Sequence, residues 1–184
     1  MRLRIADCRL RIGRIAASIR NPQSAIRNCL AALAVAGCNP YSTRPVFVAL
    51  PDAPVTYLDA ARTRIVPDIR ARLDSLGFRV TRSEPRDGYV ETAWYDPETK
   101  RSYSTDRDVP HRNRVFRIRC WLDPDVTGAT KLILEVVYRP VYDPSRTSRD
   151  LETLVPEGHP GQAVGTELIE ELKKKFGVPP ERAS

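Results

Sequence analysis

Residues 114–138, RVFRIRCWLDPDVTGATKLILEVVY, predict a pair of long antiparallel β-strands. Apolar and polar side chains alternate over 114–122 and again over 131–138, and the residues between them are rich in turn formers. The alternation in the first strand gives one face made of Phe116, Ile118, Cys120 and Leu122 and another made of Arg117, Arg119 and Trp121. One face of the sheet is therefore apolar and requires a covering layer.

Two shorter strands precede this pair. Residues 78–82 and 89–95 have strand-like patterns and are separated by the turn Arg86-Asp87-Gly88. The segments 96–111 and 140–165 show little periodicity, so we expect both to be long loops.

Helical spacing of apolar residues appears at both ends of this region. It predicts one helix over 57–76, kinked or broken at Pro67 and ended by Gly77, and another over 163–176, ended by Gly177. The expected fold is an α+β two-layer sandwich, a four-stranded antiparallel sheet with two helices on one face. We expect residues 57–178 to form this single domain and residues 179–184 to be a disordered tail.

The positive charge of the chain is concentrated at its start. The 184 residues carry a formal net charge of +7, and the first 37 hold seven arginines and one acid, which leaves 23 basic and 22 acidic residues in the other 147. A net charge of this size is typical of proteins with anionic partners. Here the remainder is nearly neutral. No apolar run reaches the ~18 residues of a spanning helix, which excludes a polytopic membrane protein.

The basic leader repeats itself. Arg2-Leu3-Arg4-Ile5 returns as Arg9-Leu10-Arg11-Ile12, and Ile19-Arg20-Asn21 returns as Ile26-Arg27-Asn28. Our interpretation is that residues 1–27 are translated repeat DNA upstream of the true start. The alternative is an unusually long basic region at the start of a signal peptide.

Residues 30–38, LAALAVAGC, follow this basic flank and have the pattern of a secretory signal. Their last four residues, Val35-Ala36-Gly37-Cys38, resemble the lipobox of bacterial lipoproteins. The resemblance implies that a signal peptidase recognises Val35, Ala36 and Gly37, and that Cys38 is acylated and becomes the first mature residue. The alternative is a buried helix ending at Gly37, with Cys38 as a small core residue.

A lipid-anchored protein would lie in the cell envelope, because two or more acyl chains hold a protein firmly on a membrane. Asn39 after the cysteine resembles the pattern of lipoproteins that reach the outer membrane and face the periplasm. Residues 38–56 would then include the lipidated cysteine and a tether. Cleavage would remove Cys8 and Cys29, so we expect the remaining Cys120 to fill the core.

Side chains suited to catalysis are sparse. His111 and His159 are isolated, and the sequence lacks Cys-x-x-Cys, His-x-x-x-His and the glycine-rich phosphate motifs. We therefore expect no catalytic residue, no metal, no cofactor and no enzymatic activity.

The arginines of 112–119, with Trp121, could stack on single-stranded nucleic acid. An exported chain rarely meets nucleic acid, and Glu91 and Glu135 can pair with these arginines across strands. We therefore expect no nucleic-acid partner and an exposed sheet face of ion pairs. If that face is open, Arg117, Arg119 and Trp121 would suit a protein partner.

A further resemblance concerns Leu73-Asp74-Ser75-Leu76-Gly77-Phe78 and Gly88-Tyr89-Val90. This pattern, over roughly 59–138, resembles the repeated domain of the BamC-type (NlpB) lipoproteins of outer-membrane assembly. That family usually carries two such domains, and this chain has room for one. The resemblance implies a non-catalytic adaptor or assembly accessory that contacts an envelope protein. The alternative is a lipoprotein that binds a small apolar or lipid ligand between sheet and helices.

Overall fold

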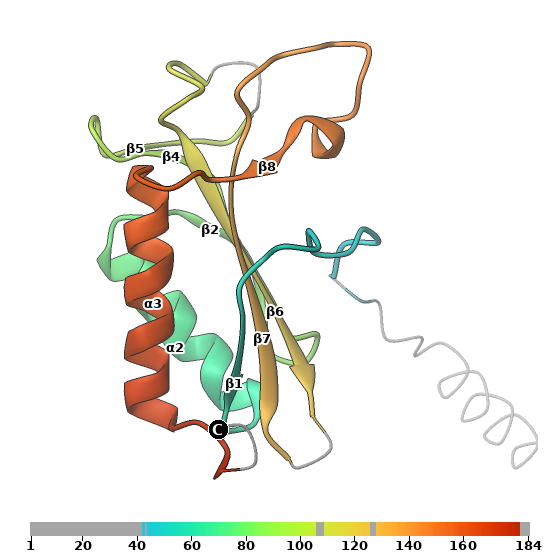
Figure 1. Cartoon of the computed structure of the whole chain (residues 1–184), viewed down its shortest axis with the longest axis vertical. Coiled ribbons are helices and arrows are strands. Elements are labelled where there is room, and N and C mark those ends of the chain that lie inside the picture. Colours follow the sequence, from blue (N-terminus) through green and yellow to red (C-terminus); the bar gives the residue numbers. More distant parts are fainter. Residues whose placement is uncertain (1–41, 43, 106–108, 126–127, 181–184) are drawn as a thin grey trace, which may run out of the picture. The chain divides into compact units, whose positions relative to one another are not determined.

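A computed structural model describes residues 42, 44–105, 109–125 and 128–180. Figure 1 shows α-helices beside a twisted sheet. The strands are β1 (Val55–Leu58), β2 (Val80–Glu84), β3 (Tyr89–Thr92), β4 (Trp94–Asp96), β5 (Arg101–Tyr103), β6 (Phe116–Pro124), β7 (Thr130–Tyr138) and β8 (Thr153–Leu154). The helices are α2 (Arg62–Ser75) and α3 (Pro160–Phe176), and η1 (Arg149–Leu151) is a 3₁₀ turn.

The described strands pair antiparallel in the order β1-β7-β6-β3-β2. Strand β4 pairs with β6 and β5, and β8 pairs with β7 beyond the end of β1. The α+β prediction is therefore confirmed, but the prediction of four strands was wrong, because the sheet has eight. Strands β1, β5 and β8 are two to four residues long, too short to show a reliable alternation.

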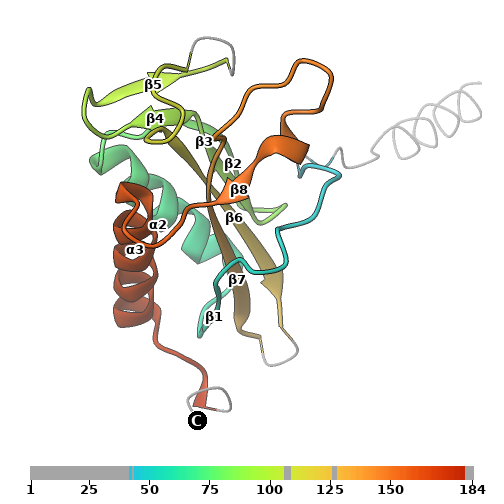
Figure 2. The ribbon, with the colours of Figure 1, turned by 45° about the horizontal axis from the view of Figure 1, so that its top comes forward.

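Both helices pack on the same face of the sheet (Figure 2), where buried apolar side chains form the main core. The alternation predicted for β6 and β7 holds, and Cys120 lies fully buried in this core as expected. Burial also raises the pKa of the Cys120 thiol. The sheet contributes Val90, Phe116, Ile118, Cys120, Leu122, Leu132, Leu134 and Val136, and the helices contribute Ile65, Val66, Ile69, Leu73, Leu168 and Leu172.

Helix α2 differs from its prediction at its start and at Pro67. It begins at Arg62, because residues from Val55 to Leu58 pair with β7 as a strand. It then continues through Pro67 without a break. The predicted end at Gly77 is confirmed, since Gly77 has a φ of +85° and the Phe78 N–H donates to the Leu73 carbonyl at 3.0 Å.

Helix α3 approaches the sheet closely because two of its residues are glycines. A Cβ at Gly165 would lie 2.8 Å from Val136 Cγ2, and one at Gly161 would lie 2.9 Å from the Phe116 ring. Helix α3 begins at Pro160, three residues before the predicted start at 163. The sequence pattern does not indicate this first turn, because it contains Gly161 and glycine weakens a helix in isolation. Its predicted end at Gly177 is confirmed.

The predicted loop 140–165 also contains η1 and β8, and the predicted loop 96–111 contains β5. Among the described residues, no helix is long and apolar enough to cross a membrane.

Candidate functional site

The sheet face turned away from the helices carries a cluster of charged and aromatic side chains. Strand register creates it, because Arg119 lies opposite Glu91 on β3 and opposite Glu135 on β7. Alternation places Arg117 and Trp121 on the same side as Arg119. Opposite charges at directly paired positions attract one another across strands.

Three arginines and three glutamates form what we call the ion network: Arg117, Arg119, Arg149, Glu91, Glu135 and Glu152. Arg119 donates through Nη1 and Nη2 to Glu152 at 2.6 and 2.9 Å, and through Nε to Glu91 at 3.0 Å. Arg149 donates to both carboxylate oxygens of Glu135, at 2.8 and 3.0 Å, and also to Glu152. Arg117 donates to Glu91 at 3.1 Å. The six formal charges therefore balance.

The network is buried at its centre. The side chains of Arg119 and Glu135 are 3% and 0% exposed. Burial alone would lower the pKa of Arg119, but hydrogen bonds and charges from Glu152 and Glu91 outweigh burial and raise it. A buried charge is tolerated only when it is paired and hydrogen-bonded, so each carboxylate here is needed to keep its arginine inside.

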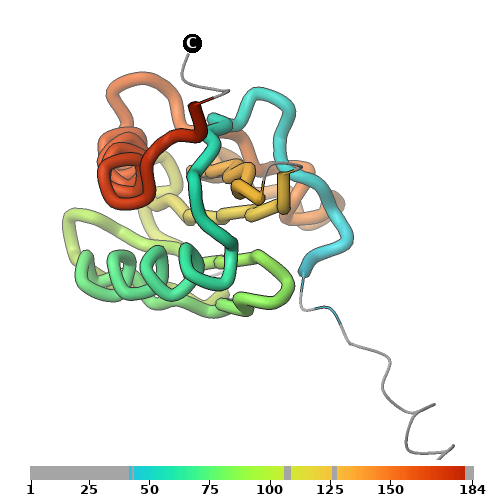
Figure 3. Tube along the Cα trace, turned by 90° about the horizontal axis from the view of Figure 1, so that it is seen from below, coloured from blue at the N-terminus to red at the C-terminus, as the bar shows by residue number. Residues whose placement is uncertain are grey.

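An irregular segment that we call the strap, residues 44–53, covers this face. Figure 3 shows the strap, blue to teal, on the side of the sheet away from α3. The Phe47 ring lies edge-on to Trp121 at 6.3 Å, and the guanidinium groups of Arg119 and Arg149 lie 5.1 and 4.7 Å from its centre. The Leu50 N–H donates to Glu135.

These contacts revise the predicted tether. From Arg44 onward the chain packs on the sheet, and Arg44 bonds Asp123 at 2.7 Å. Residues 44–56 therefore belong to the folded part, and the predicted boundary at 57 was placed too late. Side chain–sheet contacts of this kind leave no periodic signal in a short irregular segment.

The residues predicted for partner binding are brought together, but they are not open to solvent. Cross-strand ion pairs between Glu91 and the arginines are confirmed. The expectation of an exposed face was wrong, since Arg119 and Trp121 are each 3% exposed and lie under the strap and the Arg149–Glu152 segment. The sequence carries no local signal for this burial, because the residues that cover Arg119 and Trp121 come from segments without periodicity.

Aromatic rings extend this face beside the network. Trp94 is buried and packs against Arg117, whose guanidinium lies 4.5 Å from the indole centre, and against Arg139 at 5.8 Å. Arg139 also lies 5.8 Å from the centre of the half-exposed Tyr142 ring. The stack therefore runs from the interior to the surface.

His159 serves the fold. Its Nδ1 accepts from the Gly161 N–H at 3.0 Å, and its Nε2 lies 3.0 Å from the Asn113 carbonyl, which fits a neutral ring that donates through Nε2. Burial lowers the pKa of His159. His111 is exposed in a turn with a φ of +48°. Within the described ranges, no three His, Cys, Asp or Glu side chains are grouped to hold a metal ion.

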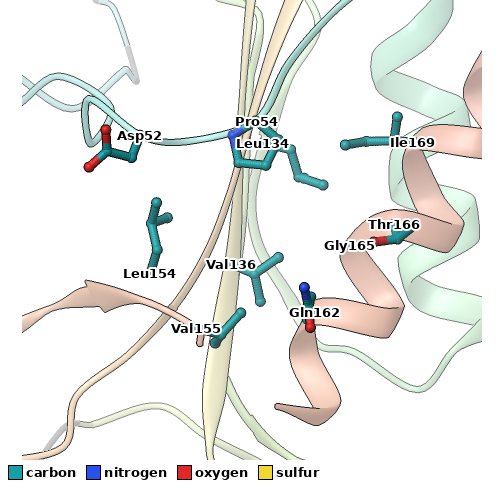
Figure 4. Close-up of a pocket in the computed structure, with 10 residues that line it drawn as sticks. All are labelled: Asp52, Pro54, Leu134, Val136, Leu154, Val155, Gln162, Gly165, Thr166 and Ile169. Atoms are coloured by element: carbon teal, nitrogen blue, oxygen red, sulfur yellow. The ribbon is translucent and has the colours of Figure 1, made fainter. Parts of the chain in front are cut away.

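A pocket of about 230 Å³ opens between β7 and α3 (Figure 4), beside the part of β7 that lies between its pairing with β1 and its pairing with β8. Its walls combine apolar side chains with a few polar ones. They come from Asp52, Pro54, Leu134, Val136, Leu154, Val155, Gln162, Gly165, Thr166 and Ile169. The volume is below the ~300–1,000 Å³ of usual small-molecule sites.

The predicted lipidation residue Cys38 and its recognition residues Val35, Ala36 and Gly37 lie outside the described residues. No protein-family model matches the chain, and no curated protein matches it.

Proposed function

We propose that the chain is an envelope lipoprotein, anchored through acylated Cys38, that acts as a non-catalytic adaptor or assembly accessory through protein contacts. The observation that carries this proposal is the strap, which follows the lipobox-like Val35-Ala36-Gly37-Cys38 closely in sequence and packs on a sheet face rich in arginine and aromatic residues. Arginine, tryptophan and tyrosine are the residues that dominate protein interfaces.

The proposed location is the outer membrane, with the domain facing the periplasm and an envelope protein as partner. Nucleic acid is not a proposed partner, because the arginines of the ion network are balanced by Glu91, Glu135 and Glu152. A nucleic-acid site depends on an excess of positive charge that can reach phosphates. We also propose no cofactor and no catalysis.

Fatty-acid labelling combined with membrane fractionation tests the anchor. We expect the wild-type chain to incorporate the label and to sediment with membranes, and Cys38→Ala to do neither. Cys29→Ala is the matched control, since Cys29 precedes the proposed cleavage site and its loss leaves labelling unchanged. Equal labelling of wild type and Cys38→Ala would reject the proposal.

The second candidate is a lipoprotein that binds a small apolar or lipid ligand; the observation behind it is the apolar lining of the pocket beside α3, whose volume of about 230 Å³ limits it to a small ligand. Its apolar walls include Leu134, Val136 and Ile169. Displacement of a fluorescent fatty acid tests it, with Thr166→Phe, on the exposed side of the pocket, as the variant that fills the space. Binding that Thr166→Phe abolishes would favour this second function over the first.

A further inference from the structure

Phe47 is the strap side chain that lies between the arginines, and Leu50 packs farther along against the cluster that contains Trp94 and Val137. Phe47 contacts Trp121 and both guanidinium groups, while its neighbours Val46 and Val48 point outward, Val46 fully and Val48 81% exposed. We call the place occupied by Phe47 the aromatic slot, formed by Trp121, Arg119 and Arg149. A slot that accepts a single ring from an irregular segment resembles a recognition site more than a core.

The other close strap contacts to the ion network use backbone atoms. The Val48 carbonyl accepts from Arg149 at 2.8 Å, and the Leu50 N–H donates to Glu135. Every extended peptide offers such groups. The site therefore requires an aromatic side chain, a carbonyl one residue later and an N–H three residues later.

The slot is held in place independently of Phe47. Arg119 is fixed by Glu152 and Glu91, and Arg149 is fixed by Glu135. The ion pairs would therefore persist if the strap left, and the slot would stay preorganised for another ring. Preorganisation lowers the entropic cost of binding, and the two guanidinium groups attract the face of an aromatic ring.

We propose that the aromatic slot and the two backbone-binding groups beside it form a site for an extended peptide segment that carries an aromatic residue, and that the strap occupies this site in the absence of the partner. The proposal deepens the proposed function and rests on it, because it names the surface and the partner class for the protein contacts. It also restores a role for Arg119 and Trp121, which become accessible only when the strap is displaced.

The strap and a partner peptide would compete for the aromatic slot, so a partner must bind tightly enough to displace the strap. The strap is part of the same chain, so its effective concentration at the slot is in the millimolar range, as for short flexible linkers. A free peptide with the same contacts binds measurably only when the strap is weakened.

Peptide binding by the full chain tests this proposal. The probe is a fluorescent peptide with the strap sequence 44–53, RPVFVALPDA, and binding is followed by anisotropy. All proteins carry Cys38→Ala, so the result is independent of lipidation and a failure here leaves the anchor untouched. We expect Phe47→Ala to bind the peptide at least about tenfold more tightly than the parent chain, a difference of about 1.4 kcal/mol.

Val46→Ala is the matched control, because it changes an exposed strap side chain and leaves the slot occupied, so its affinity stays at the parent value. A peptide in which alanine replaces the phenylalanine should lose binding to Phe47→Ala. If Phe47→Ala fails to fold, Phe47→Leu keeps the bulk without the aromatic face and should show a smaller gain. Folded variants that bind the peptide no better than the parent chain, or that bind the alanine peptide equally well, would overturn the proposal.

Discussion

Arg119 and Glu152 join strand β6 to the segment after η1 through two hydrogen bonds, 2.6 Å from Nη1 to Oε2 and 2.9 Å from Nη2 to Oε1. The residues are 33 positions apart in the chain, and both are buried. This pair closes the layer that covers the charged face, and it fixes one wall of the aromatic slot.

Removal of this charge pair should destabilise the fold. Glu152→Gln keeps the shape but leaves Arg119 with Glu91 as its main remaining hydrogen-bond partner. We expect a loss of roughly 3 kcal/mol in the free energy of unfolding, the low end for a broken buried pair. Urea denaturation measures it. Glu157→Gln, at an exposed site, is the control and should change stability by less than about 0.5 kcal/mol. Equal effects of the two substitutions would contradict this account of the network.

Close packing of α3 predicts that Gly165→Ala destabilises the protein although alanine favours helices. The new Cβ would lie 2.8 Å from Val136 Cγ2, and overpacking costs about 1–3 kcal/mol. Val136→Ala removes the obstructing methyl groups, so the double variant should recover part of the loss. Thermal unfolding of the two single variants and the double variant gives the coupling energy. Additive effects would show that the two side chains do not compete for the same space.

The hairpin between β2 and β3 depends on Gly88. Its φ is +63°, and a Cβ there would lie 2.2 Å from the Leu122 carbonyl oxygen, which belongs to the backbone. Gly88→Ala should therefore cost at least about 3 kcal/mol, from the left-handed conformation and the clash together. Gly128→Ala is the matched control, because Gly128 has a φ of +80° and no atom of the described residues would lie within 4 Å of a Cβ there, so strain alone costs about 1–2 kcal/mol. Chemical denaturation that ranks the two equally would contradict the clash.

Acid should weaken the start of α3 through His159. Its pKa is lowered from 6.5 in the folded protein, mainly by burial, so the unfolded chain binds a proton that the folded chain does not. The stabilisation is complete above pH 6.5 and decreases as the pH falls, by at most about 1.4 kcal/mol per pH unit.

Unfolding free energies measured between pH 7 and pH 5 check this slope. His159→Asn keeps an acceptor at the helix start and does not titrate, so its profile should be flatter than that of the parent chain. Identical profiles for the parent chain and His159→Asn would show that His159 does not cause the loss of stability in acid.

The parts predicted correctly from the sequence are those with long, regular patterns. Strands β6 and β7 alternate over nine residues each, and their register then paired Arg119 with Glu135. Strand β8 has two residues, and Arg149 and Glu152 precede it in a segment without periodicity. Such short pieces acquire their positions from tertiary contacts, which no local pattern encodes.

The candidate site was predicted in part for the same reason. Arg117, Arg119 and Trp121 belong to β6, so their shared face followed from alternation. Their burial did not, because it depends on Phe47, which reaches the sheet from a segment read as a tether. Glycine weakens isolated helices, so Gly165 gave no indication that it belongs to a well-packed helix. In the structure, its missing side chain lets α3 pack closely on Val136.

Intact-mass spectrometry of the protein purified from membranes tests the proposed lipid anchor at Cys38. We expect a mature chain that begins at Cys38 and carries the added mass of two or three acyl chains. An unmodified cysteine at position 38, within a longer chain that retains the residues before it, would show that the protein is not a lipoprotein.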